Sequence, residues 1–298
     1  MVLRRSLVAL ALLAGVALPV AGWLQPAAAG PGAELRSYAP LEPACRITDK
    51  RLDSVSGMAV RADGTWVEND RGAVLYRLRP DCSVAQAVDL GPELKKLGVT
   101  LVDVEDMALG PDGWLWLSDS GGNRKARDSV TLVGWKDADT PVKVVTLRYS
   151  VGTHDTEALM MDVTGRAVMV TKVEGSGPAE VYATRMPLGA GAQNLHYMGT
   201  TQLDRPAGAG PGARLVTAAD VDSTGTYVVL RTYTNAWEFD APDGDLVHAL
   251  LSTRPRRVPL PASKQGEAIA YNADGSELLT TGEGSPVDLD RVQIVRGQ

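Results

Sequence analysis

The chain has 298 residues, of which 44% are hydrophobic and 5% aromatic, and its 36 aspartates and glutamates outnumber its 30 lysines and arginines. This length allows one large or two ordinary domains. With a formal net charge of −6 and no extended basic run, the composition excludes nucleic acid and anionic membrane surfaces as expected partners. An acidic protein can still offer carboxylates to a cation.

The N-terminus has the features of an export signal. Arg4 and Arg5 precede the apolar run LVALALLAGVALPVAGWL, and Ala27 and Ala29 supply the small residues that a signal peptidase requires. We therefore expect residues 1–29 to be a signal peptide and the mature protein to be secreted, with 28 basic against 36 acidic residues and a charge of −8. An uncleaved membrane anchor is the alternative, although the apolar run is short for a span.

Five related stretches follow, each with an apolar run, a turn that ends in glycine and a second β-rich run. They read VSGMAVRADGTWVEND, VEDMALGPDGWLWLSD, TEALMMDVTGRAVMVTK, VTAADVDSTGTYVVLR and GEAIAYNADGSELLTTGE. Their turn glycines, spaced by 49, 52, 60 and 50 residues, are Gly64, Gly113, Gly165, Gly225 and Gly275. A repeat of about fifty residues with roughly four strands predicts a β-propeller blade.

The repeats predict an all-β fold, a five-bladed β-propeller over residues 45–298 that follows an N-terminal segment at 30–44. Six blades, with a degenerate one hidden in 183–215, are the alternative. GPELKKLG is the only short helical candidate after the signal. ALLSTRPRRVPL, ahead of the fifth repeat, has the pattern of a strand.

The last repeat lacks an outer strand, and ACRITD, ahead of the first repeat, is expected to provide it. Cys45 lies in this segment and Cys82 follows the first repeat. Because exported chains enter an oxidising compartment, we expect a disulfide between them. A catalytic thiol is the alternative, but none of the three histidines forms a recognisable motif with a cysteine.

Polar residues recur at one position of the repeat, eight residues before each turn glycine. These residues are Ser56, Glu105, Glu157, Thr217 and Glu267. Asp103 and Asp155 precede two of the glutamates by two residues and should share their side of the strand. Because the inner strands of a propeller run in one direction around a channel, equivalent positions should form a ring at one mouth.

The second strand of each hairpin should return to the same mouth with further charged residues. We expect four neighbouring pairs: Asp119 with Glu105, Lys172 with Glu157, Arg231 with Thr217, and Glu283 with Glu267. Carboxylates without cysteine or histidine suit a hard cation, and Ca²⁺ is the common one outside cells. The sequence therefore predicts calcium ligands at Glu105, Glu157 and Glu267. The alternative is a salt-bridge network in which Lys172 and Arg231 neutralise the glutamates.

A metal at the mouth would permit hydrolysis, because it polarises an acyl or phosphoryl oxygen and acidifies bound water. Asp119 is then the predicted general base. Lys172 and Arg231 are the predicted contacts to an anionic substrate such as a phosphoester. Ordinary structural ion pairing is the alternative for all three residues.

Several segments resemble a family of secreted β-propeller proteins from actinobacteria, over roughly residues 45–283. They are CRITDKRLDSVSGMAV, DVEDMALGPDGWLWLSDSGGNR, HDTEALMMD, VTK, LRTYTNAWEF and QGEAIAY. More remotely, the chain is similar to phytase-like and gluconolactonase/paraoxonase-like propellers. That resemblance implies calcium held by Glu105, Glu157 and Glu267 and hydrolysis of phosphoesters or lactones. This chain departs from the relatives' D-I-G-D-N pattern, because Gly122 replaces their second acid.

Two functions are therefore expected. The first is a metal-dependent hydrolase of a small phosphoester or lactone. The second is a non-enzymatic propeller that binds a small anionic molecule or an extracellular protein. We expect a monomer in either case.

Overall fold

The computed structural model describes residues 36–122, 126–173, 177–189, 191–204, 206, 210–260 and 265–297. The predicted signal peptide at 1–29 lies outside these ranges. Within them, no helix is long and apolar enough to span a bilayer.

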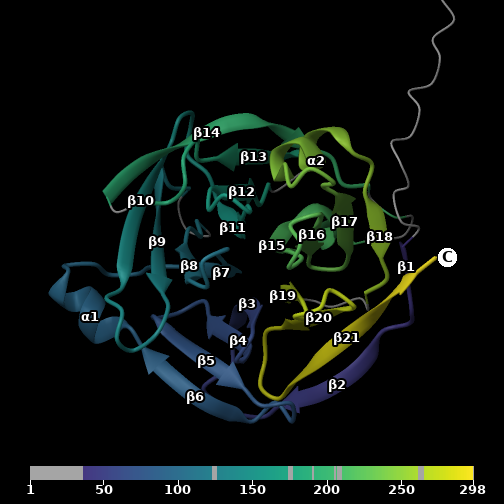
Figure 1. Cartoon of the computed structure of the whole chain (residues 1–298), viewed down its shortest axis with the longest axis horizontal. Coiled ribbons are helices and arrows are strands. Elements are labelled where there is room, and N and C mark those ends of the chain that lie inside the picture. The colour runs from purple at the N-terminus through teal and green to yellow at the C-terminus, as the bar shows by residue number, and fades with distance from the viewer. Residues whose placement is uncertain are drawn as a thin grey trace, which may run out of the picture. The chain divides into compact units, whose positions relative to one another are not determined.

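The described strands form five units arranged around a centre (Figure 1). Unit one contains β3 (Val55–Arg61), β4 (Gly64–Asn69), β5 (Val74–Leu78) and β6 (Val84–Asp89). Unit two contains β7 (Val104–Leu109), β8 (Leu115–Asp119), β9 (Ser129–Trp135) and β10 (Lys143–Tyr149). Unit three contains β11 (Thr156–Met161), β12 (Ala167–Thr171), β13 (Ala179–Ala183) and β14 (Gly191–Thr201). Unit four contains β15 (Val216–Val221), β16 (Tyr227–Thr232), β17 (Ala236–Asp240) and β18 (Arg256–Val258). Unit five contains β19 (Gly266–Tyr271), β20 (Glu277–Gly282) and β21 (Val287–Arg296), with β1 (Arg36–Tyr38) and β2 (Glu42–Ile47) outside them.

The inner strands close into a ring, which makes the fold a β-propeller as the repeats predict. β3 contacts β7, and contacts continue through β11 and β15 to β19, which lies against β3. Within each unit, the glycine turn of the repeat joins the inner strand to the second strand of the same unit. All five turn glycines have positive φ. A sixth unit is the alternative that the sequence allows for the range 183–215. The described residues there form the end of β13, the strand β14 of unit three and the 3₁₀ helix η1 (Pro211–Arg214), and they contain no strands of a further unit. β10 and β14 pair in parallel, so units two and three share one sheet.

The hydrophobic core lies between neighbouring units, because each inner strand packs both of its faces. On β11, Ala158 and Met160 pack with residues of unit four. Leu159 and Met161, on the alternate face, pack with residues of unit two. Five buried clusters of this kind separate the five neighbouring pairs. The continuous apolar runs of the inner strands therefore follow from burial on both sides.

Two α-helices of the described residues lie outside the ring of inner strands, and the sequence indicates only the first. GPELKK forms α1 (Gly91–Lys96) as predicted. The strand expected at ALLSTRPRRVPL is wrong at its start, because Leu246–Ser252 form helix α2. The Asp245 side chain caps α2 by accepting the His248 N–H at 3.0 Å. Leu246 and Leu250, one helical turn apart, are both buried in the core of units three and four.

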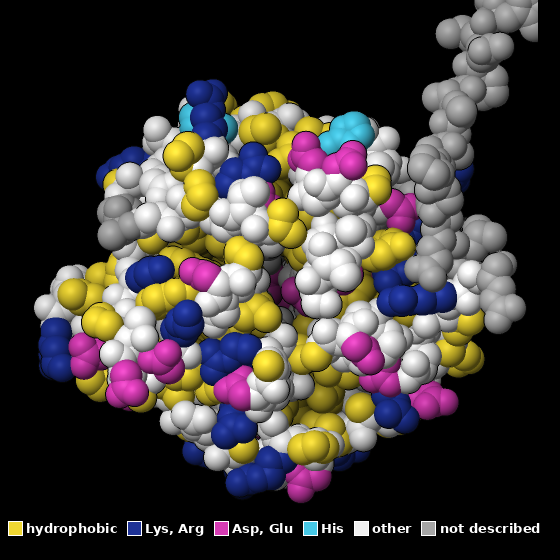
Figure 2. Space-filling model, viewed as in Figure 1, with side chains coloured by type: hydrophobic (Ala, Val, Ile, Leu, Met, Phe, Trp, Pro, Cys, Tyr) yellow, Lys and Arg dark blue, Asp and Glu magenta, His cyan; other side chains and the backbone are white. Residues whose placement is uncertain are grey.

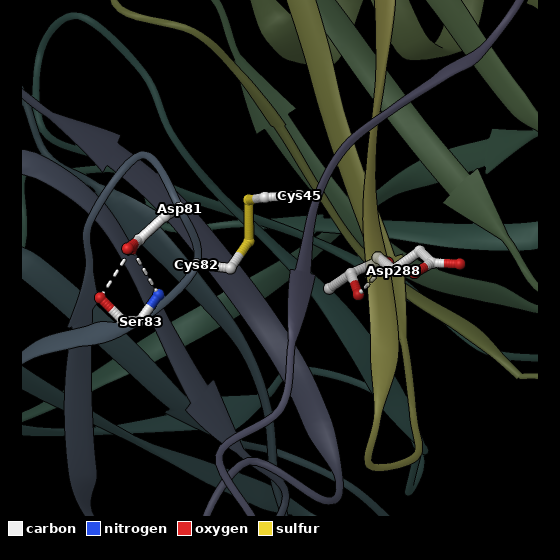
Figure 3. The surroundings of a disulfide bond; sticks show 6 residues. Cys45, Asp81, Cys82, Ser83 and Asp288 are labelled. Atoms are coloured by element: carbon white, nitrogen blue, oxygen red, sulfur yellow. Dashed lines mark hydrogen bonds between the residues drawn. A yellow bond between two sulfur atoms is a disulfide. The ribbon is translucent and has the colours of Figure 1, made fainter.

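The two ends of the propeller domain meet in unit five, as predicted from ACRITD. β2 pairs antiparallel with β21, and β1 continues along the same edge of β21 (Figure 1). The predicted disulfide is confirmed: Cys45 on β2 is bonded to Cys82, which follows β5 of unit one (Figure 3). The bond therefore links the closing strand to the first unit.

Buried carboxylates also connect units that are distant in sequence. Glu238 on β17 is fully buried, and it accepts hydrogen bonds from Arg36 at 2.7 Å and Tyr38 at 2.6 Å in β1. It also accepts one from Tyr271 on β19, at 2.8 Å. This network fixes β1 against units four and five.

Asp106, the third residue of β7, links inner strands of three units. Its carboxylate oxygens accept the backbone N–H groups of Met107 at 2.9 Å, Leu159 at 2.8 Å and Ala219 at 3.1 Å. Leu159 belongs to β11 and Ala219 to β15, so one fully buried side chain holds three inner strands together. Burial raises the pKa of this carboxyl well above its usual value.

Reduction of the disulfide should destabilise the propeller without unfolding it. A cross-link over 37 residues contributes about 3–4 kcal/mol by the chain-entropy relation, so Tm should fall by roughly 8–15 °C. Thermal melts of the oxidised protein and of the Cys45→Ser/Cys82→Ser variant measure this difference. Equal melting temperatures would show that the cross-link does not constrain the unfolded chain.

Asp106→Ala should lower the free energy of unfolding by about 3 kcal/mol or more, since three buried N–H groups lose their acceptor at roughly 1–3 kcal/mol each. Asp106→Asn keeps one carbonyl oxygen and should cost less. Chemical denaturation measures both, with Asp139→Ala at an exposed position as the control. A loss no larger than that of Asp139→Ala would contradict the role given to Asp106.

Candidate functional site

The predicted ring exists at one mouth of the channel. Each ring position is the second residue of an inner strand, and all five side chains are buried; they are Ser56, Glu105, Glu157, Thr217 and Glu267. In every unit the pairing register between the inner strand and its neighbour shifts across this residue. Such β-bulges redirect a side chain, and here the bulge recurs at the position that carries the glutamates.

Three carboxylates converge at this mouth. Glu105, Asp155 and Glu157 each offer one oxygen, and these oxygens lie within 4.8 Å of one another. Glu105 and Glu157 are the second residues of β7 and β11, and Asp155 directly precedes β11. Asp155, which the sequence places beside Glu157, is therefore a more direct partner of Glu105 than Glu267 is.

The glycine-rich loop after β8 lies against this acidic cluster of Glu105, Asp155 and Glu157. A Cβ atom on Gly121 would overlap Glu105 Oε1 and would lie 2.6 Å from Asp103 Oδ2, so only glycine fits there. The Gly122 N–H donates to Asp155 Oδ1 at 2.6 Å. Gly122 thus contacts the cluster through its backbone, at the position where the resembling family carries an acid.

Lys172 provides a cation to the cluster. Its Nζ lies 2.5 Å from Glu157 Oε1 and donates to the Tyr233 hydroxyl at 2.7 Å. The predicted Lys172–Glu157 neighbours are thus an ion pair. Burial lowers the pKa of Lys172, but the Glu157 charge outweighs it and the net effect is a raised pKa. No sequence signal points to Tyr233 except its place two residues after Arg231, directly after β16, the strand that returns to this mouth.

Arg231 is buried nearby without a close carboxylate. Among the described residues, no ion pair within 4 Å joins it to Glu267, and its Nε and Nη1 have no hydrogen-bond partner. Its guanidinium packs against Gly266, where any Cβ would overlap it. Burial lowers the pKa of Arg231 to about 10, although the Glu267 charge opposes that shift. Its predicted neighbour Thr217 donates a hydrogen bond to the Gly266 carbonyl at 2.8 Å.

Asp119 lies at the end of β8 and is engaged by other groups. Arg127 donates to its two oxygens at 2.9 and 3.1 Å, and the Val102 and Asp103 N–H groups donate to Oδ1 at 3.0 and 2.8 Å. These contacts hold the segment that carries Asp103 next to Glu105. The predicted role of Asp119 as general base stays a prediction.

The mouth carries more carboxylates than cations. Seven carboxyl groups of the described residues lie here (Asp103, Glu105, Asp119, Asp155, Glu157, Glu267 and Glu283), and the nearby cations are Lys172, Arg231 and the Arg127 that pairs with Asp119. Burial, followed by the charges of neighbouring carboxylates, raises the pKa of Glu105 and brings that of Glu267 to about 9. Burial also raises the pKa of Glu157, while Lys172 opposes the shift. Protons or a bound cation must therefore compensate the excess negative charge.

At this site acidic side chains lie close together, whereas on the outer surface charged side chains alternate with other residue types. Figure 2 shows lysine, arginine and acidic side chains scattered over one face of the ring, and acidic side chains in the hollow at its centre. Acidic side chains thus line part of the central hollow on the face shown.

No protein-family model matches the chain, and no curated protein matches it. Solved structures with a similar fold include the gluconolactonase of Xanthomonas campestris, at 15% identity and a TM-score of 0.48, over 89% of this chain and 100% of that one. Another is Myxococcus xanthus glutaminyl cyclase, at 12% identity and a TM-score of 0.48, over 88% and 98% of the two chains. A chain of a nidogen/laminin complex matches at 12% identity and a TM-score of 0.47, over 78% and 73%. Likeness at this level assigns no activity.

Proposed function

We propose that the acidic mouth binds a divalent cation, and that this cation is calcium. The observation that carries the proposal is the convergence of one oxygen each from Glu105, Asp155 and Glu157 within 4.8 Å. Oxygen ligands from carboxylates suit a hard cation. Glu105 Oε1 is buried without a hydrogen-bond partner, so an ion would supply the interaction that this atom lacks. Glu267, predicted from the sequence as a third ligand, would add its negative charge near Glu157.

The reaction that fits this mouth is hydrolysis of a small anionic ester, a phosphoester or a lactone that carries an acid group. A bound divalent cation would polarise the oxygen of the bond to be cleaved. Lys172 and Arg231 would hold the anionic group, because both cations lie buried at the mouth and Arg231 keeps two unpartnered nitrogen atoms. Tyr233, hydrogen-bonded to Lys172, is placed to donate a proton to a leaving oxygen.

We further propose that the protein works outside the cell. The Cys45–Cys82 disulfide is compatible with an oxidising compartment, and the N-terminal signal pattern predicts export. Calcium at extracellular concentration could then occupy even a site of modest affinity. The relation to secreted actinobacterial propellers is part of the same proposal.

Calcium should stabilise the protein, and a chelator should remove that effect. At a hundredfold excess over Kd, a bound ion contributes about 2.7 kcal/mol, which corresponds to roughly 5–10 °C in Tm for a chain of this size. Glu105→Gln and Asp155→Asn should abolish the difference. Glu93→Gln, on the exposed helix α1, is the control and should retain it. A melting temperature that responds to calcium equally in all four proteins would place the ion elsewhere.

Turnover should appear in a panel of phosphomonoester, phytate, lactone and aryl-ester substrates with calcium present. Lys172→Met should lower kcat/KM for an anionic substrate by about a hundredfold, since a charged contact to the reacting group is lost. Lys95→Gln, on the exposed face of α1, should leave turnover unchanged. No turnover in a panel tested with calcium-saturated protein would favour the non-enzymatic binding propeller.

A further inference from the structure

A cavity of about 320 Å³ lies at the opposite mouth of the channel. All five inner strands end at it. Their apolar and aromatic contributions to its wall are Val60, Leu109, Met161, Val221 and Tyr271, and β15 also contributes Asp220. Ligand pockets commonly have volumes of about 300–1,000 Å³ and a largely apolar wall. The size and lining of this cavity meet both conditions.

The cavity is separate from the acidic mouth. Asp106, the third residue of β7, lies between them along the strand and is hydrogen-bonded to β11 and β15. The ring glutamates are the second residues of the inner strands, whereas the cavity residues are at the strand ends. Occupation of one site therefore does not require the other.

The charged residues that line the cavity are all acidic. Asp162, Asp220 and Asp222 contribute to the wall, and no lysine, arginine or histidine does so among the described residues. Asp162 and Asp222 are engaged in their own turns, where they accept from Thr164 at 2.6 Å and from Tyr227 at 2.8 Å. Asp220 differs, because its Oδ2 reaches across to the Tyr271 N–H of the neighbouring unit at 2.7 Å.

The surroundings of Asp220 favour an organic cation over a bare metal ion. A calcium ion needs about 6–8 oxygen ligands, and the turns already use the carboxylate oxygens of Asp162 and Asp222. An alkylammonium group can instead donate a charge-assisted hydrogen bond to one carboxylate while its alkyl part covers apolar residues. Burial raises the pKa of Asp220 to about 7, and a bound cation would favour its ionised form.

We propose that this cavity is a second binding site, which takes a small organic ammonium ion with its nitrogen on Asp220 and its alkyl group against the ends of the inner strands. The site requires no metal. It also requires no turnover at the acidic mouth.

Isothermal titration with n-butylammonium chloride tests the proposal, in calcium and again in chelator. Butylammonium should bind at one site per chain in both buffers. n-Butanol, which lacks the charge, and butyrate, which reverses it, should bind at least tenfold more weakly. Equal binding of all three compounds, or no binding of butylammonium, would overturn the assignment.

Two variants locate the ion on the protein. Asp220→Asn should weaken butylammonium binding at least tenfold by removing the charge. Val163→Arg places a competing cation at an exposed position of the rim and should do the same without disturbing the core. Val295→Arg, exposed on the outer strand β21, carries the same added charge and should bind as the unmodified protein does. Unchanged binding in folded Asp220→Asn and Val163→Arg would place the ion outside the cavity.

Discussion

Closure of the inner strands into one ring is the constraint on which the rest of this structure depends. Because β3, β7, β11, β15 and β19 start at the same mouth, residues at the same strand position must meet near the axis. Two like charges about 4 Å apart repel by roughly 4 kcal/mol at an effective dielectric near 20. The glutamates at that position therefore need compensation from protons, cationic side chains or a bound ion.

The surrounding residues hold the carboxylates together despite this repulsion. Lys172 neutralises Glu157, and the Gly122 N–H stabilises Asp155. Gly121 lets the loop approach Glu105 closely enough to keep it buried. A buried charged cluster that is only partly compensated costs stability, and such sites tend to be functional. The same channel has a different character at its other end, where apolar strand ends enclose a cavity with one cross-strand carboxylate.

The repeat spacing predicted the fold and the ring because both depend on local periodicity. The distance from turn glycine to glutamate is the same in each hairpin, so the equivalence of Glu105, Glu157 and Glu267 could be read without any long-range information. The ion pair of Lys172 with Glu157 could be predicted from antiparallel pairing of the two strands of one hairpin. The last repeat lacks an outer strand and an extra strand precedes the first repeat, so the pairing of β2 with β21 could be predicted. The Cys45–Cys82 bond followed from the presence of two cysteines in an exported chain.

What the sequence did not reveal depends on contacts between units. Tyr233 reaches Lys172 from a different unit, and Asp106 bonds to β11 and β15, so no pattern within one repeat indicates either contact. Arg127, which lies shortly before β9, pairs with Asp119 at the end of β8. Helix α2 depends on the Asp245 cap and on burial between units three and four, neither of which a short apolar run distinguishes from a strand.

Elemental analysis tests most directly whether the acidic mouth holds a divalent cation. The purified protein, equilibrated with calcium and passed through a metal-free desalting column, should retain one calcium per chain, and Glu105→Gln should retain none. A calcium content near zero in the unmodified protein, or the same content in folded Glu105→Gln, would contradict the account. The first result would leave protons and Lys172 to compensate the carboxylates.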